Sequence, residues 1–204
     1  MLFEDTYKTI KSRSEGIYKD KVSKFIAIAL PVGSEAEVKS KLDDIRGEYH
    51  DARHHCFAYV LGPDKSASRF NDDGEPSGTA GRPIMGQINS NDLTNILVVV
   101  VRYFGGTKLG VRGLINAYKS SASEAIVASS IIEKTIDEIY LVNFDYPAMN
   151  HVMQIVKDPG VNILKQDFDL HCALEYQVRK SKADLLLSKL AAIKGVEVKH
   201  IRNE

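Results

Sequence analysis

The sequence has few cysteines, no excess of either charge and no long hydrophobic run. Its two cysteines, Cys56 and Cys172, form no C-x-x-C pair, which argues against a disulfide framework and predicts buried free thiols in a reducing compartment. The 27 Lys and Arg residues balance 27 Asp and Glu residues, so overall charge does not draw the chain to polyanions, and nucleic-acid binding would depend on local patches. No apolar stretch approaches the ~20 residues of a membrane span, and the N-terminus lacks a signal-peptide core. A cytoplasmic protein is expected.

The familiar motifs of catalysis are missing as well. There is no G-x-S-x-G elbow, no H-E-x-x-H helix and no EF-hand loop, so neither a serine nucleophile nor a standard metal site is indicated. His151, His171 and His200 lie late in the chain without evident partners. We therefore expect no catalytic constellation, no cofactor and no bound metal.

Two segments instead combine glycines with charged residues where a strand should give way to a helix. The first covers residues 71–83 and reads NDDGEPSGTAGRP, and the second covers residues 102–113 and reads RYFGGTKLGVRG. Glycine lets backbone N–H groups approach a ligand closely and accepts positive φ without steric cost. These two segments are the predicted functional site.

The second segment has the properties of an anion site. No acidic residue occurs between Asp92 and Glu124, a stretch that contains several cations. A helix starting near Gly110 would point its N–H groups and positive dipole end at the same anion as Lys108. The alternative is that the glycines permit close packing and that the cations are solvated. The predicted nucleic-acid or phosphate-binding residues are Arg82, Arg102, Gly105, Gly106, Lys108, Gly110 and Arg112.

Three carboxylates occur within four residues of the first segment, at Asp72, Asp73 and Glu75. Clustered carboxylate oxygens suit Mg²⁺ or Ca²⁺, and a metal there would bridge to phosphate. Ion pairing with Arg82, Arg102 or Arg112 explains the same residues equally well. Together with His55, these carboxylates form a second possible loop site.

The run His54-His55-Cys56 resembles a set of metal ligands, but strand alternation separates it. His54 and Cys56 fall on one face and His55 on the other, so one ion cannot easily collect all three. We expect Cys56 in the core and one histidine hydrogen-bonded to a loop carboxylate. His55 shares its face with Phe57 and Tyr59, which leaves base stacking there as a weaker alternative.

Hydrophobic periodicity predicts an α+β fold in two domains. The order ββαββαβα leads up to Ser129-Ser130, with a capping box at Ser34 and a doubly covered strand over residues 96–101. After a boundary near residues 130–136, the order βαββαβ, with two strands meeting around Asp167 to Asp169, is typical of a ferredoxin-like domain. The predicted domains are residues 1–133 and 134–204.

The segments 54–59, 72–83 and 98–118 together resemble the signature of the IMPACT family, whose bacterial members are called YigZ-type proteins. The resemblance implies an N-terminal domain like a ribosomal-protein domain and a ferredoxin-like C-terminal domain like one of elongation factor G. It also implies a role in translation, since eukaryotic relatives restrain a translation-regulating kinase and bacterial ones are suspected to bind nucleic acid or the ribosome. Arg112-Gly113 and Asn116 depart from the family pattern, which moves a positive charge by about one helical turn.

The favoured hypothesis is a non-enzymatic regulator of translation that binds RNA or the ribosome through its glycine-rich basic loops. One alternative is an enzyme that acts on a phosphorylated small molecule with Mg²⁺ and Lys108. Another is a regulator that docks onto a protein partner in translation. The zero net charge favours these two alternatives over a purely electrostatic binder of nucleic acid.

Overall fold

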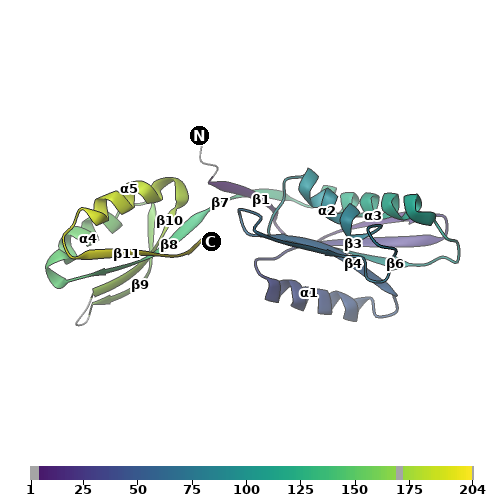
Figure 1. Ribbon diagram of the computed structural model, residues 1–204, viewed down its shortest axis with the longest axis horizontal. Coiled ribbons are helices and arrows are strands. Elements are labelled where there is room, and N and C mark those ends of the chain that lie inside the picture. The colour runs from purple at the N-terminus through teal and green to yellow at the C-terminus, as the bar shows by residue number, and fades with distance from the viewer. Residues whose placement is uncertain (1–4, 169–171, 204) are drawn as a thin grey trace. The chain divides into compact units, whose positions relative to one another are not determined.

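The computed structural model describes residues 5–168 and 172–203, which form two compact units (Figure 1). The first unit is Tyr7–Lys134, and the second takes in Asp5, Thr6 and the described residues after Lys134. The predicted domain bounds, residues 1–133 and 134–204, stay a prediction. None of the described helices is long and apolar enough to cross a membrane.

The first unit is built on a five-stranded antiparallel sheet with the strand order β2-β3-β6-β4-β5. Helices α2 and α3 cover one face of this sheet, and α1 covers the other (Figure 1). The elements in chain order are β2 (Ser14–Asp20), β3 (Ser23–Pro31), α1 (Glu35–Glu48), β4 (His54–Leu61), β5 (Ala67–Asn71), α2 (Gly81–Ser90), β6 (Ile96–Tyr103) and α3 (Gly110–Val127). The predicted order ββαββαβα is confirmed.

Strand β6 is buried on both faces, as its continuous apolar run predicts. Val98 and Val100 pack into the core beneath α2 and α3, whereas Val99 and Val101 pack into the core beneath α1. Two hydrophobic layers thus share one central strand, which explains why the sequence shows no polar alternation there.

The capping box that opens α1 is present. The Ser34 hydroxyl accepts a hydrogen bond from Glu37 N at 3.2 Å, and the Glu37 carboxylate accepts one from Gly33 N at 2.8 Å. The second bond comes from the residue before the cap rather than from the cap itself. Both satisfy N–H groups that a helix start leaves without partners.

One short sheet was not predicted from the sequence. Strands β1 (Thr6–Ile10) and β7 (Ile131–Thr135) pair as a two-stranded sheet, and Lys11 N donates to Ser130 O at 2.9 Å next to it. β7 is mostly exposed, and its residues do not alternate between buried and exposed positions. Its sequence therefore lacks the periodicity from which strands are predicted.

The second unit has the ferredoxin-like architecture that the sequence predicts. Its antiparallel sheet has the order β11-β8-β10-β9, with helices packed into a single core. The elements are β8 (Asp137–Phe144), a 3₁₀ turn (Tyr146–Ala148), α4 (Met149–Val156), β9 (Val161–Phe168), β10 (Cys172–Arg179), α5 (Lys180–Ala191) and β11 (Val196–Asn203). Part of the predicted meeting point of two strands, at Asp169, lies outside the described residues.

Both glycine segments belong to the same end of the first sheet. His54 at the start of β4 is paired with Arg102 near the end of β6, and Phe57 is paired with Asn71 at the end of β5. The antiparallel register therefore brings the loop after β5 and the loop after β6 together, although they lie far apart in sequence. We call residues 72–80 the acidic loop and residues 104–112 the basic loop.

Candidate functional site

Asp72 holds the N-terminus of α2. Its carboxylate accepts hydrogen bonds from the backbone N–H groups of Gly78 at 2.8 Å, Ala80 at 3.0 Å and Gly81 at 2.8 Å. Burial alone would raise the pKa of this carboxyl, but these three N–H groups more than offset it and lower the pKa below its usual value. Asp72 thus occupies the position at a helix start that a bound anion would take.

Asp73 connects the acidic loop to the start of β4. Its carboxylate accepts from His55 N at 2.6 Å, and its backbone carbonyl accepts from the His54 ring at Nδ1 over 2.8 Å. The His55 ring turns to the other face and hydrogen-bonds the Tyr49 carbonyl over 3.1 Å through Nε2. The two histidines therefore lie on opposite faces, and both stabilise loops.

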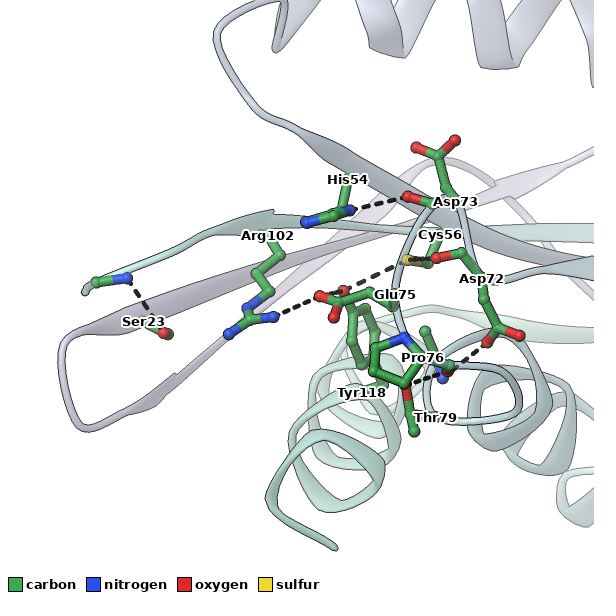
Figure 2. A network of polar contacts seen from close by, with 12 residues as sticks. Ser23, His54, Cys56, Asp72, Asp73, Glu75, Pro76, Thr79, Arg102 and Tyr118 are labelled. Carbon is green, nitrogen blue, oxygen red and sulfur yellow. Dashed lines mark hydrogen bonds and ion pairs between the residues drawn. The ribbon is translucent and has the colours of Figure 1, made fainter. Parts of the chain in front are cut away.

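Glu75 is the centre of a buried polar network (Figure 2). Arg102 Nη1 donates to Glu75 Oε1 at 2.6 Å, and the Tyr118 hydroxyl donates to the same oxygen at 2.8 Å. The side chains of this ion pair are only 7% and 4% exposed. The network links the acidic loop to β6 and to α3, and it makes Arg102 the ion-pair partner of an acidic-loop carboxylate.

Cys56 and Tyr118 extend this network into the core. Cys56 Sγ lies 3.0 Å from the Asp72 carbonyl oxygen and 3.3 Å from the Tyr118 hydroxyl (Figure 2). Burial raises the pKa of both the Cys56 thiol and the Tyr118 phenol. A thiol that stays protonated at neutral pH is a poor nucleophile, so Cys56 has the properties of a structural cysteine.

The three carboxylates of the acidic loop thus all accept hydrogen bonds from the protein itself. Asp72 is bound by three N–H groups, Asp73 by one, and Glu75 by an arginine and a tyrosine. Over the ranges 5–168 and 172–203, no three His, Cys, Asp or Glu side chains gather in a way that could hold a metal ion.

The glycines of the basic loop serve two different purposes. A Cβ on Gly105 would come within 2.1 Å of the Val22 backbone carbon, so only glycine lets this loop pack against the turn between β2 and β3. Gly106 and Gly110 instead have positive φ angles of 85° and 73° and have open space around them. Gly105 is therefore needed for close packing, and the other two glycines for backbone conformation.

The cations of the second segment separate into one buried and two exposed groups. Arg102 is 6% exposed and belongs to the core network. Lys108 and Arg112 are exposed before and within the first turn of α3, and neither has an ion-pair partner among the described residues. Arg82 is exposed on α2, close enough to Asp72 to lower the pKa of its carboxyl further.

The position that departs from the family pattern has a structural role. Asn116 Nδ2 donates to the Tyr18 hydroxyl at 3.3 Å, which links α3 to β2. The cation one turn earlier, Arg112, lies at the surface.

The suggestion that bases stack on the face of His55 is wrong. Phe57 and Tyr59 are only 7% and 6% exposed, because α1 covers that face of the sheet. Phe104, by contrast, is an aromatic residue of the basic loop that is 53% exposed, and it follows β6 directly. Phe104 does not stand out in the sequence, because it extends an apolar strand pattern.

Tyr118 and Phe25 also belong to the site, although the sequence did not assign them to it. The two rings meet edge to face with centroids 5.2 Å apart, and the Arg102 guanidinium lies 5.5 Å from the Phe25 ring. Helical spacing indicates Tyr118 only as an apolar position of α3. A buried tyrosine usually needs a hydrogen-bond partner for its hydroxyl, and this requirement is the one sequence signal from which a polar network around Tyr118 could have been predicted.

Comparison with known proteins gives consistent matches. Residues 21–126 match the family described as Impact N-terminal domain. "IMPACT family member YvyE" of Bacillus subtilis is 38% identical over 141 residues, which cover 69% of this chain and 65% of that protein. "IMPACT family member YigZ" of Escherichia coli is 33% identical over 173 residues, which cover 84% of this chain and 85% of that protein.

One solved structure, described as "Crystal structure of an hypothetical protein", matches along nearly the whole chain. It is 29% identical, with a TM-score of 0.77 over 99% of this chain and 100% of that one. The domain match takes in more than half of the 204 residues, and the YigZ match covers most of both chains. The chain belongs to the IMPACT family.

Proposed function

We propose that this protein binds RNA, free or within the ribosome, through the basic loop, and that this contact tunes translation. The observation that carries the proposal is the pair of cations Lys108 and Arg112, which are exposed at the start of α3 and lack ion-pair partners among the described residues. In the acidic loop, the Asp72 and Glu75 carboxylates accept hydrogen bonds from Gly81 N and Arg102. Positive charge therefore remains available to phosphate groups at this surface.

The surroundings of the basic loop add to the attraction for phosphate. The N-terminus of α3 presents backbone N–H groups and the positive end of the helix dipole. Gly105 packs against the turn between β2 and β3, which carries the exposed Lys21. Because the whole chain has no net charge, such a local patch has to supply most of the electrostatic attraction.

The alternative of a Mg²⁺-dependent enzyme gains no support from the same geometry. A metal that bridges to phosphate needs carboxylate oxygens facing the ligand. In the acidic loop, Asp72 and Glu75 instead accept hydrogen bonds from the protein's own donors. Translation as the process is supported by family membership, since the family resemblance implies that role.

Salt dependence of RNA binding tests the proposal. Each phosphate contact to a single strand contributes about −0.7 to the slope of log K against log salt. Lys108→Gln or Arg112→Gln should each flatten the slope by about 0.7 and weaken all RNA sequences alike. Fluorescence anisotropy of a labelled oligonucleotide at several salt concentrations measures both effects.

The matched control is Lys182→Gln, which removes an exposed lysine from α5 of the other unit. This variant should keep the wild-type slope. Equal losses in Lys108→Gln and Lys182→Gln would show that the contact is not local to the basic loop. No measurable RNA affinity of the wild type at low salt would overturn the proposal and favour docking onto a protein partner.

A further inference from the structure

Phe104 presents an exposed aromatic ring that the fold holds in place from behind. The Arg102 guanidinium carbon lies 5.3 Å from the centroid of this ring and 5.5 Å from that of the Phe25 ring. The ion pair with Glu75 holds the guanidinium in place, with Arg102 Nη1 donating to Glu75 Oε1 at 2.6 Å. The ring therefore has a rigid cationic support, yet Phe104 remains 53% exposed. Single exposed hydrophobic side chains are common on protein surfaces, so the feature that sets Phe104 apart is the contact of its ring with the paired arginine.

A pocket of about 280 Å³ opens beside the ring, a volume just below the range usual for small-ligand sites. Its polar lining is held by internal hydrogen bonds. The Tyr103 hydroxyl donates to Asp51 at 2.7 Å, and the His54 ring uses Nδ1 to reach the Asp73 carbonyl. Its lining includes Asp51, Arg53, His54, Arg102, Tyr103 and Phe104. The pocket is thus a preformed hollow with an aromatic side, an exposed cation and several polar groups.

One buried donor in this lining has no acceptor. Arg102 Nε is buried and makes no hydrogen bond to any described residue, although Nη1 of the same group is paired with Glu75. A buried donor without a partner costs free energy and calls for an explanation. Arg102 also lines the pocket, so this unpartnered donor belongs to a side chain of the pocket wall.

We propose that Phe104 and this pocket hold one unpaired base of a single-stranded RNA whose phosphates lie along the basic loop. This inference rests on the proposed function and names its ligand more closely. A base has a π-face for Phe104 and polar ring edges for the groups that line the pocket, whereas inorganic phosphate has no π-face. In a duplex both faces of each base are covered, so the site selects unpaired strands.

A tryptophan in place of Phe104 reports stacking directly, because the chain contains no other tryptophan. In Phe104→Trp, a single-stranded oligouridylate should quench the fluorescence in a saturable way, and an RNA duplex should quench it far less. The control is Val127→Trp, at the last residue of α3, where the side chain is 80% exposed. Its fluorescence should stay unchanged on addition of the same oligonucleotide.

The RNA affinities of two further variants show whether binding needs the π-face of residue 104 or only an apolar side chain over Arg102. Phe104→Leu keeps an apolar side chain over the guanidinium but removes the π-face, and it should weaken single-strand binding about 5- to 150-fold. Phe104→Tyr keeps the π-face and should bind within about twofold of the wild type. Both variants should unfold at the wild-type urea midpoint, which separates a binding defect from a folding defect.

The outcomes distinguish this inference from the function on which it rests. Single-strand binding that depends on Lys108 but is unchanged in Phe104→Leu would overturn the base pocket and leave RNA binding in place. Equal affinity of the wild type for single strands and duplexes would also overturn it. Absence of RNA binding by the wild type at low salt would remove both proposals together.

Discussion

The two loops both combine glycines with charged residues, yet the charged groups of one are bonded within the protein and those of the other are exposed to solvent. In the acidic loop, Asp72 and Glu75 accept hydrogen bonds from backbone N–H groups, an arginine and a tyrosine. In the basic loop, Lys108 and Arg112 extend into solvent. One loop uses its charge to hold the fold together, and the other keeps its charge at the surface.

This difference shows that clustered charge alone does not identify a binding site. What matters is whether the protein already satisfies the charged groups. The acidic loop has the composition of a metal site but uses Asp72 as a helix cap. Its role is to place Glu75 where it orders Arg102. The acidic loop therefore supports the strand from which the basic loop extends.

The largest effect should follow from breaking the buried ion pair. Glu75→Ala leaves Arg102 without its counter-charge and Tyr118 without an acceptor, both largely buried. Removal of one partner of a buried pair costs about 3–5 kcal/mol. Urea unfolding of the variant measures this loss.

The matched control is the double variant Glu75→Gln with Arg102→Met, which removes both charges while keeping similar volumes. We expect it to recover most of the lost stability, because replacing a whole buried pair is often close to neutral. A wild-type free energy of unfolding in Glu75→Ala would contradict a structural role for the acidic loop.

A somewhat smaller effect should distinguish the adjacent glycines of the basic loop. Gly105→Ala forces a methyl group into the Val22 backbone and should cost about 3 kcal/mol. Gly106→Ala meets no neighbouring atom but retains an unfavourable φ of 85°, so it should cost about 1 kcal/mol. Thermal unfolding of both variants tests the ranking, and equal losses would refute the assignment of close packing to Gly105.

The next effect concerns pH. Because the folded state lowers the pKa of Asp72 below the ordinary 3.8, this carboxylate stabilises the fold above that pH. The contribution is lost as the pH falls from about 4 through the folded-state value. Asp72→Asn still accepts hydrogen bonds but does not titrate, and it should cost about 1–2 kcal/mol at pH 7.

The free energies of unfolding of the wild type and Asp72→Asn should therefore converge as the pH is lowered from about 5 towards about 2.5. Chemical denaturation at several pH values measures this convergence. A difference that stays constant over the whole range would show that the Asp72 charge does not contribute to stability.

The smallest effect on stability is expected in the basic loop itself. Lys108→Gln and Arg112→Gln remove exposed charges without ion-pair partners among the described residues. Each should change the free energy of unfolding by no more than about 0.5 kcal/mol. A loss of several kcal/mol would show that these cations belong to the fold rather than to a binding surface.

Sequence patterns predicted the elements that have a strong period. The run of valines predicts β6, and the capping box at Ser34 predicts the start of α1. Both signals are contained in a few neighbouring residues of the sequence. The pairing of β1 with β7 was not predictable, since the two strands lie far apart in the sequence and β7 is mostly exposed. Local signals carry no information about such partners.

The sequence predicts the candidate site at the two glycine segments, but not which of their charged residues are buried and which are exposed. The glycines predict close backbone approach, and Gly105 makes such an approach to the Val22 backbone. Nothing local distinguishes Arg102, which turns inward to Glu75, from Lys108, which stays exposed. That choice depends on Glu75 and Tyr118, which reach the same point from other elements.

The central claim is that the basic loop binds RNA while the acidic loop serves the fold. The most direct test compares RNA affinity at low salt in the double variant Lys108→Glu with Arg112→Glu and in Asp72→Asn, both at pH 7 under conditions where both variants are folded. We predict that the charge reversal reduces affinity at least about 100-fold at unchanged stability, from two lost phosphate contacts and added repulsion. Asp72→Asn should bind as the wild type does despite its lower stability. Wild-type affinity in the charge-reversed protein would contradict the account.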